Sequence, residues 1–200
     1  MNAILLAGGK SSRFGENNKA LTEINGQPML IHIISRLQQV FQTTYVIGDK
    51  KEYSFLREEY SQIEIKEDII PEKGPLGGLY TGLKYSDTSY NCLVGCDMPL
   101  LTVSYYRFLK KYSRENHISE ALVPRYESQL EPLAAIYTSR CLPVLSNFIN
   151  NDKLRFQIFL KKIDLTVISD KKLKQKFKQP EQLFYNINYK KDLARIRNDL

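Results

Sequence analysis

The sequence predicts an α/β fold with a mostly parallel central sheet and helices on both of its faces. Three observations support this expectation. Short apolar runs alternate with segments of helical periodicity along nearly the whole chain, an order typical of parallel sheets covered by crossover helices. A glycine-rich loop directly follows the first apolar run, where sheets of this kind bind phosphates. The 200 residues suit one domain with a substantial core.

The expected strands are short apolar runs, and the uninterrupted run at 91–95 is typical of a strand buried on both faces. They cover residues 2–6, 44–47, 63–65, 91–95, 121–124 and 133–137. The first helix is expected to open at Gln27-Pro28, because proline is tolerated in a first turn. Its buried side is marked at helical spacing by Leu30, Ile33, Ile34, Leu37 and Phe41. Further helices are expected over residues 53–60, 76–85, 102–112 and 140–148 and in part of 153–163. No repeat or linker interrupts this order, so a single domain is expected over residues 1–200.

The composition is that of an ordinary globular chain, with 42% hydrophobic residues. No run approaches the roughly 20 apolar residues of a membrane span, and no charged segment precedes the first apolar run as in a secretory signal. Cys92, Cys96 and Cys141 lack a disulfide framework, which favours reduced thiols. A metal or redox role for the Cys92–Cys96 pair is disfavoured because further ligands are missing. We therefore expect a cytoplasmic location.

The glycine-rich loop is the most informative segment. Residues 5–19 read L-L-A-G-G-K-S-S-R-F-G-E-N-N-K. Glycine lets a backbone approach a ligand closely, successive backbone N–H groups form an anion site, and Arg13 and Lys19 add fixed positive charge. The Walker pattern is absent, and G-x-G-x-x-G is excluded because Gly8 and Gly9 are adjacent. The loop therefore predicts a phosphate site of another kind, the alternative being a turn that binds nothing.

Further polar groups lie where a nucleotide site needs them. Asp97, just past the strand expected at 91–95, is the best candidate for a Mg²⁺ ligand. Asp68 follows the strand at 63–65, although such a residue is often an ordinary turn acid. G-P-L-G-G over 74–78 precedes a helix whose N-terminus favours anions, or is simply a loop that starts the helix. Asn186 and Asn188, two residues apart, are expected on one face of a strand, where their amides can bind a substrate.

Together these segments resemble the molybdenum cofactor guanylyltransferases, a family of nucleotidyltransferases. The loop is similar to the pattern L-A-x-G-x-S-x-R-[MF]-G-x-x-K, and the doubled Gly8-Gly9 looks most like this family. G-P-L-x-G, D-M-P, E-P-L at 131–133 and N-I-N at 186–188 follow in the family's order. The chain departs from the pattern at Tyr189-Lys190, where Thr-Pro is commonest, and at Gly48-Asp49, where many relatives carry asparagine.

The resemblance implies a Rossmann-like nucleotidyltransferase fold (GT-A-like), with a nucleotide-binding half over 1–100 and an acceptor-binding half over 101–200. It implies transfer of GMP from GTP to the terminal phosphate of Mo-molybdopterin, with Mg²⁺ as cofactor and pyrophosphate as the second product. The acceptor oxygen is already nucleophilic, so no activated serine or cysteine is required. Other molybdenum cofactor biosynthesis proteins and apo-molybdoenzymes are implied as partners, whereas nucleic acid and membrane are not.

The resemblance also assigns roles to individual residues. The catalytic residues are Arg13, Lys19 and Asp97, with Asp97 as the metal ligand. The nucleotide-binding residues are Leu6, Ala7, Gly8, Gly9, Lys19, Asp68 and Asp97. The acceptor-binding residues are Gly15, Gly74, Gly78, Asn186 and Asn188.

Three alternatives remain open at this stage. A related nucleotidyltransferase could use CTP or UTP and another phosphate acceptor, because the sequence does not display the contacts that choose the base. A non-catalytic nucleotide-binding module is disfavoured by the presence of Arg13, Lys19 and Asp97 together. Nucleic-acid binding through residues 151–178, which hold nine basic and three acidic residues, ranks last because few aromatic residues are interleaved for stacking. Attraction of a small polyanionic substrate is a further use for this basic stretch.

Overall fold

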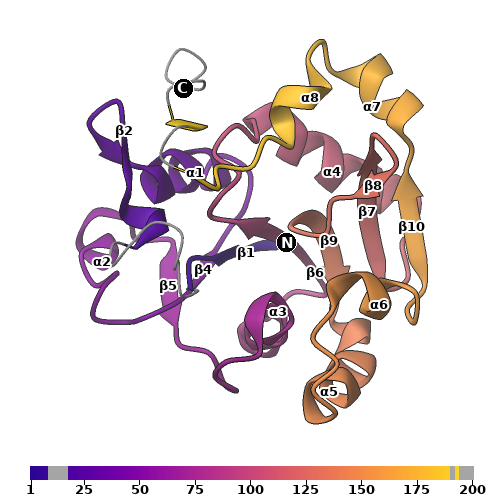
Figure 1. Ribbon diagram of the computed structural model, residues 1–200, viewed down its shortest axis with the longest axis horizontal. Coiled ribbons are helices and arrows are strands. Elements are labelled where there is room, and N and C mark those ends of the chain that lie inside the picture. Colours follow the sequence, from indigo (N-terminus) through magenta and orange to yellow (C-terminus); the bar gives the residue numbers. More distant parts are fainter. Residues whose placement is uncertain (9–17, 190–191, 194–200) are drawn as a thin grey trace.

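A twisted sheet forms the centre of the protein (Figure 1). The computed structural model describes residues 1–8, 18–189 and 192–193. The eight-stranded sheet has the order β10-β7-β9-β6-β1-β4-β5, with β8 paired to β7. Most neighbouring strands are parallel, but β9 is antiparallel to both β6 and β7. The strands are β1 (Asn2–Leu6), β4 (Thr44–Ile47), β5 (Ile63–Lys66), β6 (Tyr90–Gly95), β7 (Ala121–Tyr126), β8 (Gln129–Leu130), β9 (Ala134–Thr138) and β10 (Leu165–Ile168).

Helices cover both faces of this sheet, which confirms the predicted fold class (Figure 1). Ala3 and Leu5 of β1 pack into one apolar core with side chains of α1 and α4, whereas Ile4 and Leu6 pack into a second core with α3, α5 and α6. Successive residues of β1 thus point to opposite faces, as the pleat of a strand requires. The helices are α1 (Met29–Leu37), α2 (Leu56–Glu59), α3 (Gly74–Tyr85), α4 (Val103–Glu115), α5 (Leu142–Asn150), α6 (Phe156–Leu160), α7 (Asp170–Lys176) and α8 (Pro180–Leu183).

The strands and helices expected between residues 2 and 163 are present, with shifts at their ends, whereas the strand expected at Asn186 and Asn188 is not. α1 stops at Leu37, and α2 occupies only part of the expected 53–60 helix. The sequence analysis did not predict β10, α7 or α8 in the basic C-terminal part of the chain, where charged residues obscure the apolar pattern. The assignment of a nucleotide half and an acceptor half stays a prediction, because strands from both halves join one sheet.

A small hairpin before α1 was also missed. β2 (Glu23–Ile24) and β3 (Gln27–Pro28) are antiparallel and joined by Asn25 and Gly26. Both turn residues have positive φ, at 52° and 79°. Asn-Gly is the preferred pair for a two-residue hairpin of this kind. The signal was therefore present in the sequence.

Helix α3 packs closely on β1 because its glycines lack side chains. A Cβ on Gly82 would lie 2.5 Å from the side chain of Ile4, and a Cβ on Gly78 would lie 2.6 Å from that of Leu6. Ile4 is fully buried in the middle of the sheet, so it has little room to move. The glycines in α3 thus set how near the helix lies to the strand that leads into the phosphate loop.

We expect Gly82→Ala to destabilise the fold, although alanine favours helix more than glycine does. Overpacking of a tight core typically costs about 1–3 kcal/mol, which for a chain of this size lowers the melting temperature by several degrees. Thermal denaturation followed by circular dichroism measures this effect. Lys84→Ala, at an exposed position in the same helix, serves as the control and should leave the melting temperature nearly unchanged; a Gly82→Ala protein as stable as wild type would contradict the packing argument.

No helix in the described part of the chain is long and apolar enough to cross a membrane.

Candidate active site

Asp97 lies at the carboxyl end of the central parallel strands. β1 and β6 end level with each other, since Leu6 is paired in register with Gly95. The backbone N–H of Cys96 then donates to the carbonyl of Leu6 at 3.1 Å, which holds the two strand ends together. Gly95 allows a tight approach, because a Cβ there would lie 2.6 Å from Oδ1 of Asp97. The Asp97 carboxylate is therefore held in place yet remains one-quarter exposed.

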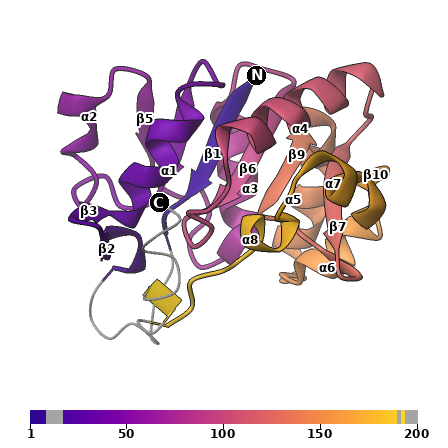
Figure 2. The same ribbon diagram turned by 90° about the horizontal axis from the view of Figure 1, so that it is seen from above.

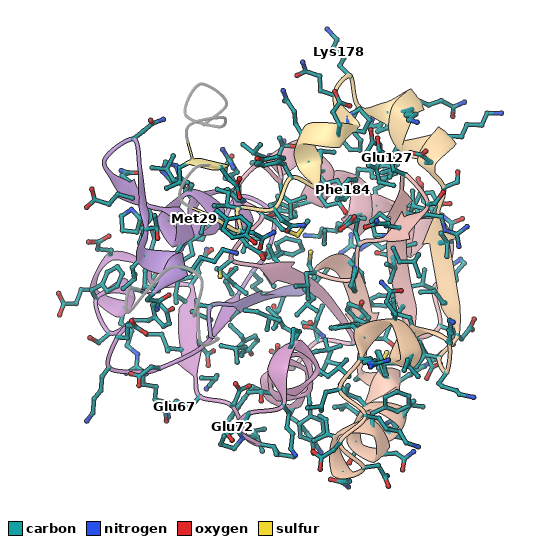
Figure 3. All side chains as sticks on the ribbon, viewed as in Figure 1. Met29, Glu67, Glu72, Glu127, Lys178 and Phe184 are labelled. Atoms are coloured by element: carbon teal, nitrogen blue, oxygen red, sulfur yellow. The ribbon has the colours of Figure 1, made fainter. Side chains whose placement is uncertain are left out.

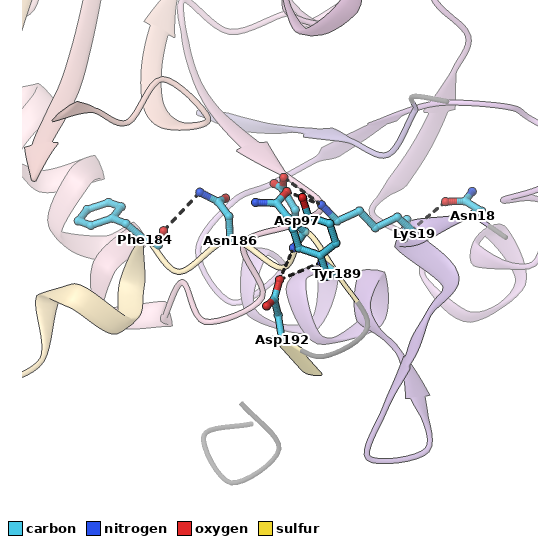
Figure 4. A network of polar contacts seen from close by, with 9 residues as sticks. Asn18, Lys19, Asp97, Phe184, Asn186, Tyr189 and Asp192 are labelled. Carbon is cyan, nitrogen blue, oxygen red and sulfur yellow. Dashed lines mark hydrogen bonds and ion pairs between the residues drawn. The ribbon is translucent and has the colours of Figure 1, made fainter. Parts of the chain in front are cut away.

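Lys19 brings a positive charge to this carboxylate from a distant part of the sequence. It opens the short 3₁₀ helix η1 (Lys19–Leu21), and the side chain of Asn18 caps η1 by accepting from the N–H of Ala20. The Lys19 ammonium lies 3.3 Å from Oδ2 of Asp97 (Figure 4). It also lies 3.3 Å from Oδ1 of Asn188. Only 14% of the Lys19 side chain is exposed. The structure thus joins three of the predicted site residues in one polar cluster.

Residues 184–189, called the C-terminal segment below, cross this same edge of the sheet (Figure 2). The backbone N–H of Ile187 donates to the carbonyl of Asp97 at 2.9 Å. The Ile187 side chain is fully buried with Ile24, Met29 and Leu100 in a small third core. One buried side chain and one backbone hydrogen bond therefore anchor the segment beside Asp97.

The prediction that Asn186 and Asn188 share one face of a strand is wrong. Residues 184–189 form no strand, because Asp192 accepts hydrogen bonds from the backbone N–H groups of Asn188 and Tyr189, each at 2.9 Å. The Asn186 amide donates to the nearby Phe184 carbonyl at 3.4 Å (Figure 4), whereas Asn188 accepts from Lys19. Only Asn188 therefore belongs to the Lys19–Asp97 cluster, and acceptor binding by either asparagine stays a prediction.

The start of the phosphate loop is held against the neighbouring strand. The N–H of Ala7 donates to the carbonyl of Ile47 at 3.0 Å. Leu6 and Ala7 are buried and Gly8 is exposed, so the chain reaches the surface at Gly8. A Cβ on Gly8 would meet only ordinary contacts. The predicted positions Gly9, Arg13 and Gly15 lie outside the described residues.

Tyr53 is a positioning residue that the sequence analysis missed. Its hydroxyl donates to the carbonyl of Ala7 at 2.7 Å and accepts from the amide of Asn18 at 2.5 Å. The ring is fully buried, and burial raises the pKa of the phenol. Tyr53 thus links Ala7 to Asn18, the residues near the two ends of the phosphate loop. It also accounts for the glycine at position 48, because a Cβ on Gly48 would lie 2.6 Å from the Tyr53 ring.

Asp68 lies apart from the Lys19–Asp97 pair. It follows β5, which is separated from β6 by β1 and β4, or by three strand spacings of about 4.8 Å each. The hydroxyl of Thr81 in α3 donates to its carboxylate at 3.4 Å, and burial raises the pKa of Asp68. Asp68 and Asp97 could therefore contact only different parts of one extended ligand, as expected of a nucleotide.

Gly74 and Gly78 of α3, both predicted to bind the acceptor, occupy positions that favour glycine for different structural reasons. Gly74 is exposed at the first position of α3 and has φ +58°, a left-handed conformation that glycine adopts without strain. Gly78 is buried against Leu6. The close packing accounts for Gly78, and contact of either residue with an acceptor stays a prediction.

Glu131 is a second acidic side chain near Asp97, which the sequence analysis named only as part of the E-P-L motif that the resemblance places on the acceptor side. It lies in the loop before β9, and its backbone N–H donates to the carbonyl of Pro124 in β7 at 2.9 Å. Its pKa is raised to about 7, first because burial disfavours the charged carboxylate and second because Asp97 repels it. The E-P-L motif was the available signal, but only the fold brings Glu131 close to Asp97.

The raised pKa of Glu131 makes stability depend on pH. Between its ordinary value of 4.5 and its folded value of about 7, the folded protein retains a proton that the unfolded chain has released. Unfolding is therefore favoured as pH rises through this window, and the loss is complete above pH 7. We expect Glu131→Gln to melt a few degrees above wild type at pH 8 and to approach wild type near pH 4.5, in metal-free buffer. Melting curves across this range test it, with Glu115→Gln at an exposed site as control; parallel curves for wild type and Glu131→Gln would contradict the assignment.

Comparison with known proteins shows which family the chain is similar to. A family model described as "MobA-like NTP transferase domain" matches residues 3–164. The chain is 33% identical over 196 residues to the "Probable molybdenum cofactor guanylyltransferase" of Pyrococcus horikoshii, with 96% of each chain covered. It is 32% identical over 170 residues to the protein of the same name from Flavobacterium johnsoniae, covering 84% of this chain and 85% of that one.

A solved structure shows the same fold. The crystal structure of molybdopterin-guanine dinucleotide biosynthesis protein A from Archaeoglobus fulgidus matches with a TM-score of 0.84 and 24% identity. The match covers 99% of this chain and 97% of that one. The similarity therefore includes the C-terminal segment that lies beside Asp97.

Proposed function

Because the chain belongs to the MobA-like NTP transferase family and is a nucleotidyltransferase, we propose that it transfers GMP from GTP to the terminal phosphate of Mo-molybdopterin. The cluster of Lys19, Asp97 and Asn188 carries this proposal, since it places a cation and a carboxylate where β1 and β6 end. The names of the relatives supply the donor and the acceptor.

The reaction needs positioning and charge neutralisation more than an activated protein nucleophile. An oxygen of the acceptor phosphate forms a bond to the α-phosphorus of GTP. The bond from that phosphorus to the bridging oxygen breaks, and its electron pair leaves with pyrophosphate. The protein accelerates such a step by aligning the two substrates and stabilising the charge on the phosphates.

The described residues can divide these tasks between them. Backbone groups at Ala7 and Gly8 would meet the nucleotide where the loop leaves the sheet. Lys19 would turn from Asp97 toward the β- and γ-phosphates, and Arg13 is proposed to assist it on the evidence of the sequence alone. Asp68, about three strand spacings away, would contact the nucleoside.

The residues present fit a divalent cation of the Mg²⁺ type. The Lys19 ammonium already lies between two oxygen atoms, one from Asp97 and one from Asn188. Mg²⁺ prefers oxygen ligands and is usually held by one or two carboxylates together with substrate phosphates. The described residues include no group of three or more His, Cys, Asp or Glu placed to bind a metal. Asp97 would therefore hold the ion beside the substrate, where it would neutralise charge on the phosphates.

Basic residues near the start of α3 support an anionic acceptor. Lys73, just before Gly74, forms an ion pair of 2.5 Å with Asp152, two residues beyond the end of α5. Lys153, Arg155 and Lys162 line a pocket next to this contact. A phosphate-bearing acceptor approaching the Gly74 loop would be attracted by these charges.

Thermal stabilisation by nucleotides is the first test. A ligand that binds only the folded state raises the melting temperature. We expect a larger shift with GTP than with ATP, CTP or UTP, and a further rise with Mg²⁺. Pyrophosphate release that requires both GTP and molybdopterin would then establish the reaction. A preference for CTP or UTP would retain the enzyme class and overturn the donor.

A further inference from the structure

A groove between α4 and α7 is separate from the Lys19–Asp97 cluster. α4 starts six residues after Asp97 and runs away from it for 13 residues, or about 20 Å at the helical rise. The pKa of the N-terminal amine, which precedes the opposite end of β1, is lowered first by burial and then by the charges of Lys110 and Arg114 on α4. The groove therefore leads away from the edge of the sheet that holds Asp97. Its walls include Arg107, Phe108, Lys111, Tyr112, Lys172 and Lys176.

The charged side chains that line this groove are exposed, and positive charge predominates among them: four are cations (Arg107, Lys111, Lys172 and Lys176) and one, Glu115, is a carboxylate. Within the described part of the chain, the side chains of Arg107, Lys172 and Lys176 form no ion pair or hydrogen bond. Lys111 has a 3.6 Å contact with Glu115, but more than half of each side chain is exposed, so this pair contributes little. Lys178, just beyond α7, also extends away from the body of the protein (Figure 3). The groove is thus a mainly cationic surface, in which Glu115 offsets only Lys111.

The floor of the groove is aromatic, but its rings are already engaged. Phe108 packs against Tyr112 at 5.6 Å between ring centroids and edge-to-face against Phe177 at 5.5 Å. Rings held in this way do not offer the free faces on which nucleic-acid bases stack. They do offer apolar surface to side chains that enter from above. A protein segment therefore suits the floor better than a nucleic acid.

The spacing of the cations indicates the shape of that segment. Arg107 and Lys111 are one helical turn apart on α4, and Lys172 and Lys176 are one turn apart on α7. Two cationic rows thus flank an aromatic floor. We propose that this groove docks an amphipathic helix of a partner protein, with apolar side chains on the floor and acidic side chains along both flanks. The partner would be held without covering Lys19 or Asp97.

Fluorescence anisotropy with a labelled synthetic peptide tests this proposal on the full chain. The probe is a helix of about five turns, or roughly 18 residues, with a leucine stripe flanked on both sides by glutamates. We expect saturable binding with a dissociation constant below about 100 μM at low salt. The variant Arg107→Gln/Lys172→Gln/Lys176→Gln should weaken it about tenfold through the loss of three exposed ion pairs.

Two controls separate docking from general attraction. Lys51→Gln/Arg140→Gln/Lys161→Gln removes the same charge from exposed sites elsewhere and should change the affinity less than about twofold, because distant surface charges are screened. A scrambled peptide of equal composition should bind much more weakly. Circular dichroism checks that both variants fold.

Four results would overturn the proposal. They are no saturable binding of the probe, equal binding of the scrambled peptide, tighter binding of single-stranded DNA that depends on the same three cations, and self-association of the protein that these substitutions abolish. The last two would assign the groove to nucleic acid or to a second copy of the chain.

Discussion

Replacing Asp97 by asparagine is expected to abolish nucleotidyl transfer while leaving the fold intact. Asparagine keeps the size of the side chain that Gly95 accommodates, but it removes the charge that pairs with Lys19. It also removes the only carboxylate of the Lys19–Asp97–Asn188 cluster. Loss of one preorganised electrostatic group at a reacting centre typically costs about 10²–10³ in rate, and loss of the proposed metal ligand adds to this. Pyrophosphate release from GTP and acceptor measures the effect.

A second readout ties this prediction to the geometry. The charge of Asp97 is the second cause of the raised pKa of Glu131, so Asp97→Asn should move that pKa back toward its ordinary value. The pH dependence of stability should then become weaker. Asp164→Asn, at an exposed position, is the matched control and should retain full activity. Near-wild-type turnover in Asp97→Asn would rule out its role as metal ligand.

The sequence predicted the local features of the site well because each depends on a short segment. A carboxylate directly after an apolar strand, as at Asp97, lies at the carboxyl edge of the sheet in any fold of this class. The same reasoning places Lys19 at this edge, since Lys19 ends the glycine-rich segment that follows the first strand. Parallel pairing of β1 with β6 then brings the two together, and that pairing follows from the alternation of strands and helices.

Contacts between distant segments could not be predicted in this way. In the sequence, Tyr53 resembles any other aromatic residue of the expected 53–60 helix, and only the fold shows its hydroxyl at the Ala7 carbonyl. Glu131 has its raised pKa only because the fold buries it near Asp97. Ile187 anchors the C-terminal segment through a backbone bond to a residue 90 positions earlier. The strand expected there depended on side-chain alternation, whereas Asp192 and Asp97 determine where the backbone hydrogen bonds go.

Removing the charge of Lys19 is expected to lower kcat/KM for GTP by about 10² or more. Without substrate, the Lys19 ammonium contacts Asp97 and Asn188. It is 14% exposed, so little water screens its charge. When GTP binds, the same flexible side chain can exchange the carboxylate for the phosphates, and the proposed Mg²⁺ can compensate Asp97. Lys19→Met keeps the apolar stem and removes the charge, so a defect in kinetics rather than in folding is expected.

The division of the defect between kcat and KM identifies what Lys19 does. A rise in KM alone would mean that the ammonium binds ground state and transition state equally, whereas equal falls in kcat and kcat/KM would mean that it acts only in the transition state. We expect both parameters to change, because pyrophosphate gains charge as it leaves. Lys19→Arg should recover part of the activity, since it restores the charge with different geometry. Asn188→Ala removes a neutral contact of Lys19 and should lower kcat/KM much less than Lys19→Met does. If Asn188→Ala lowered kcat/KM as much as Lys19→Met, the main role would belong to the C-terminal segment that positions Lys19 and not to the charge of Lys19.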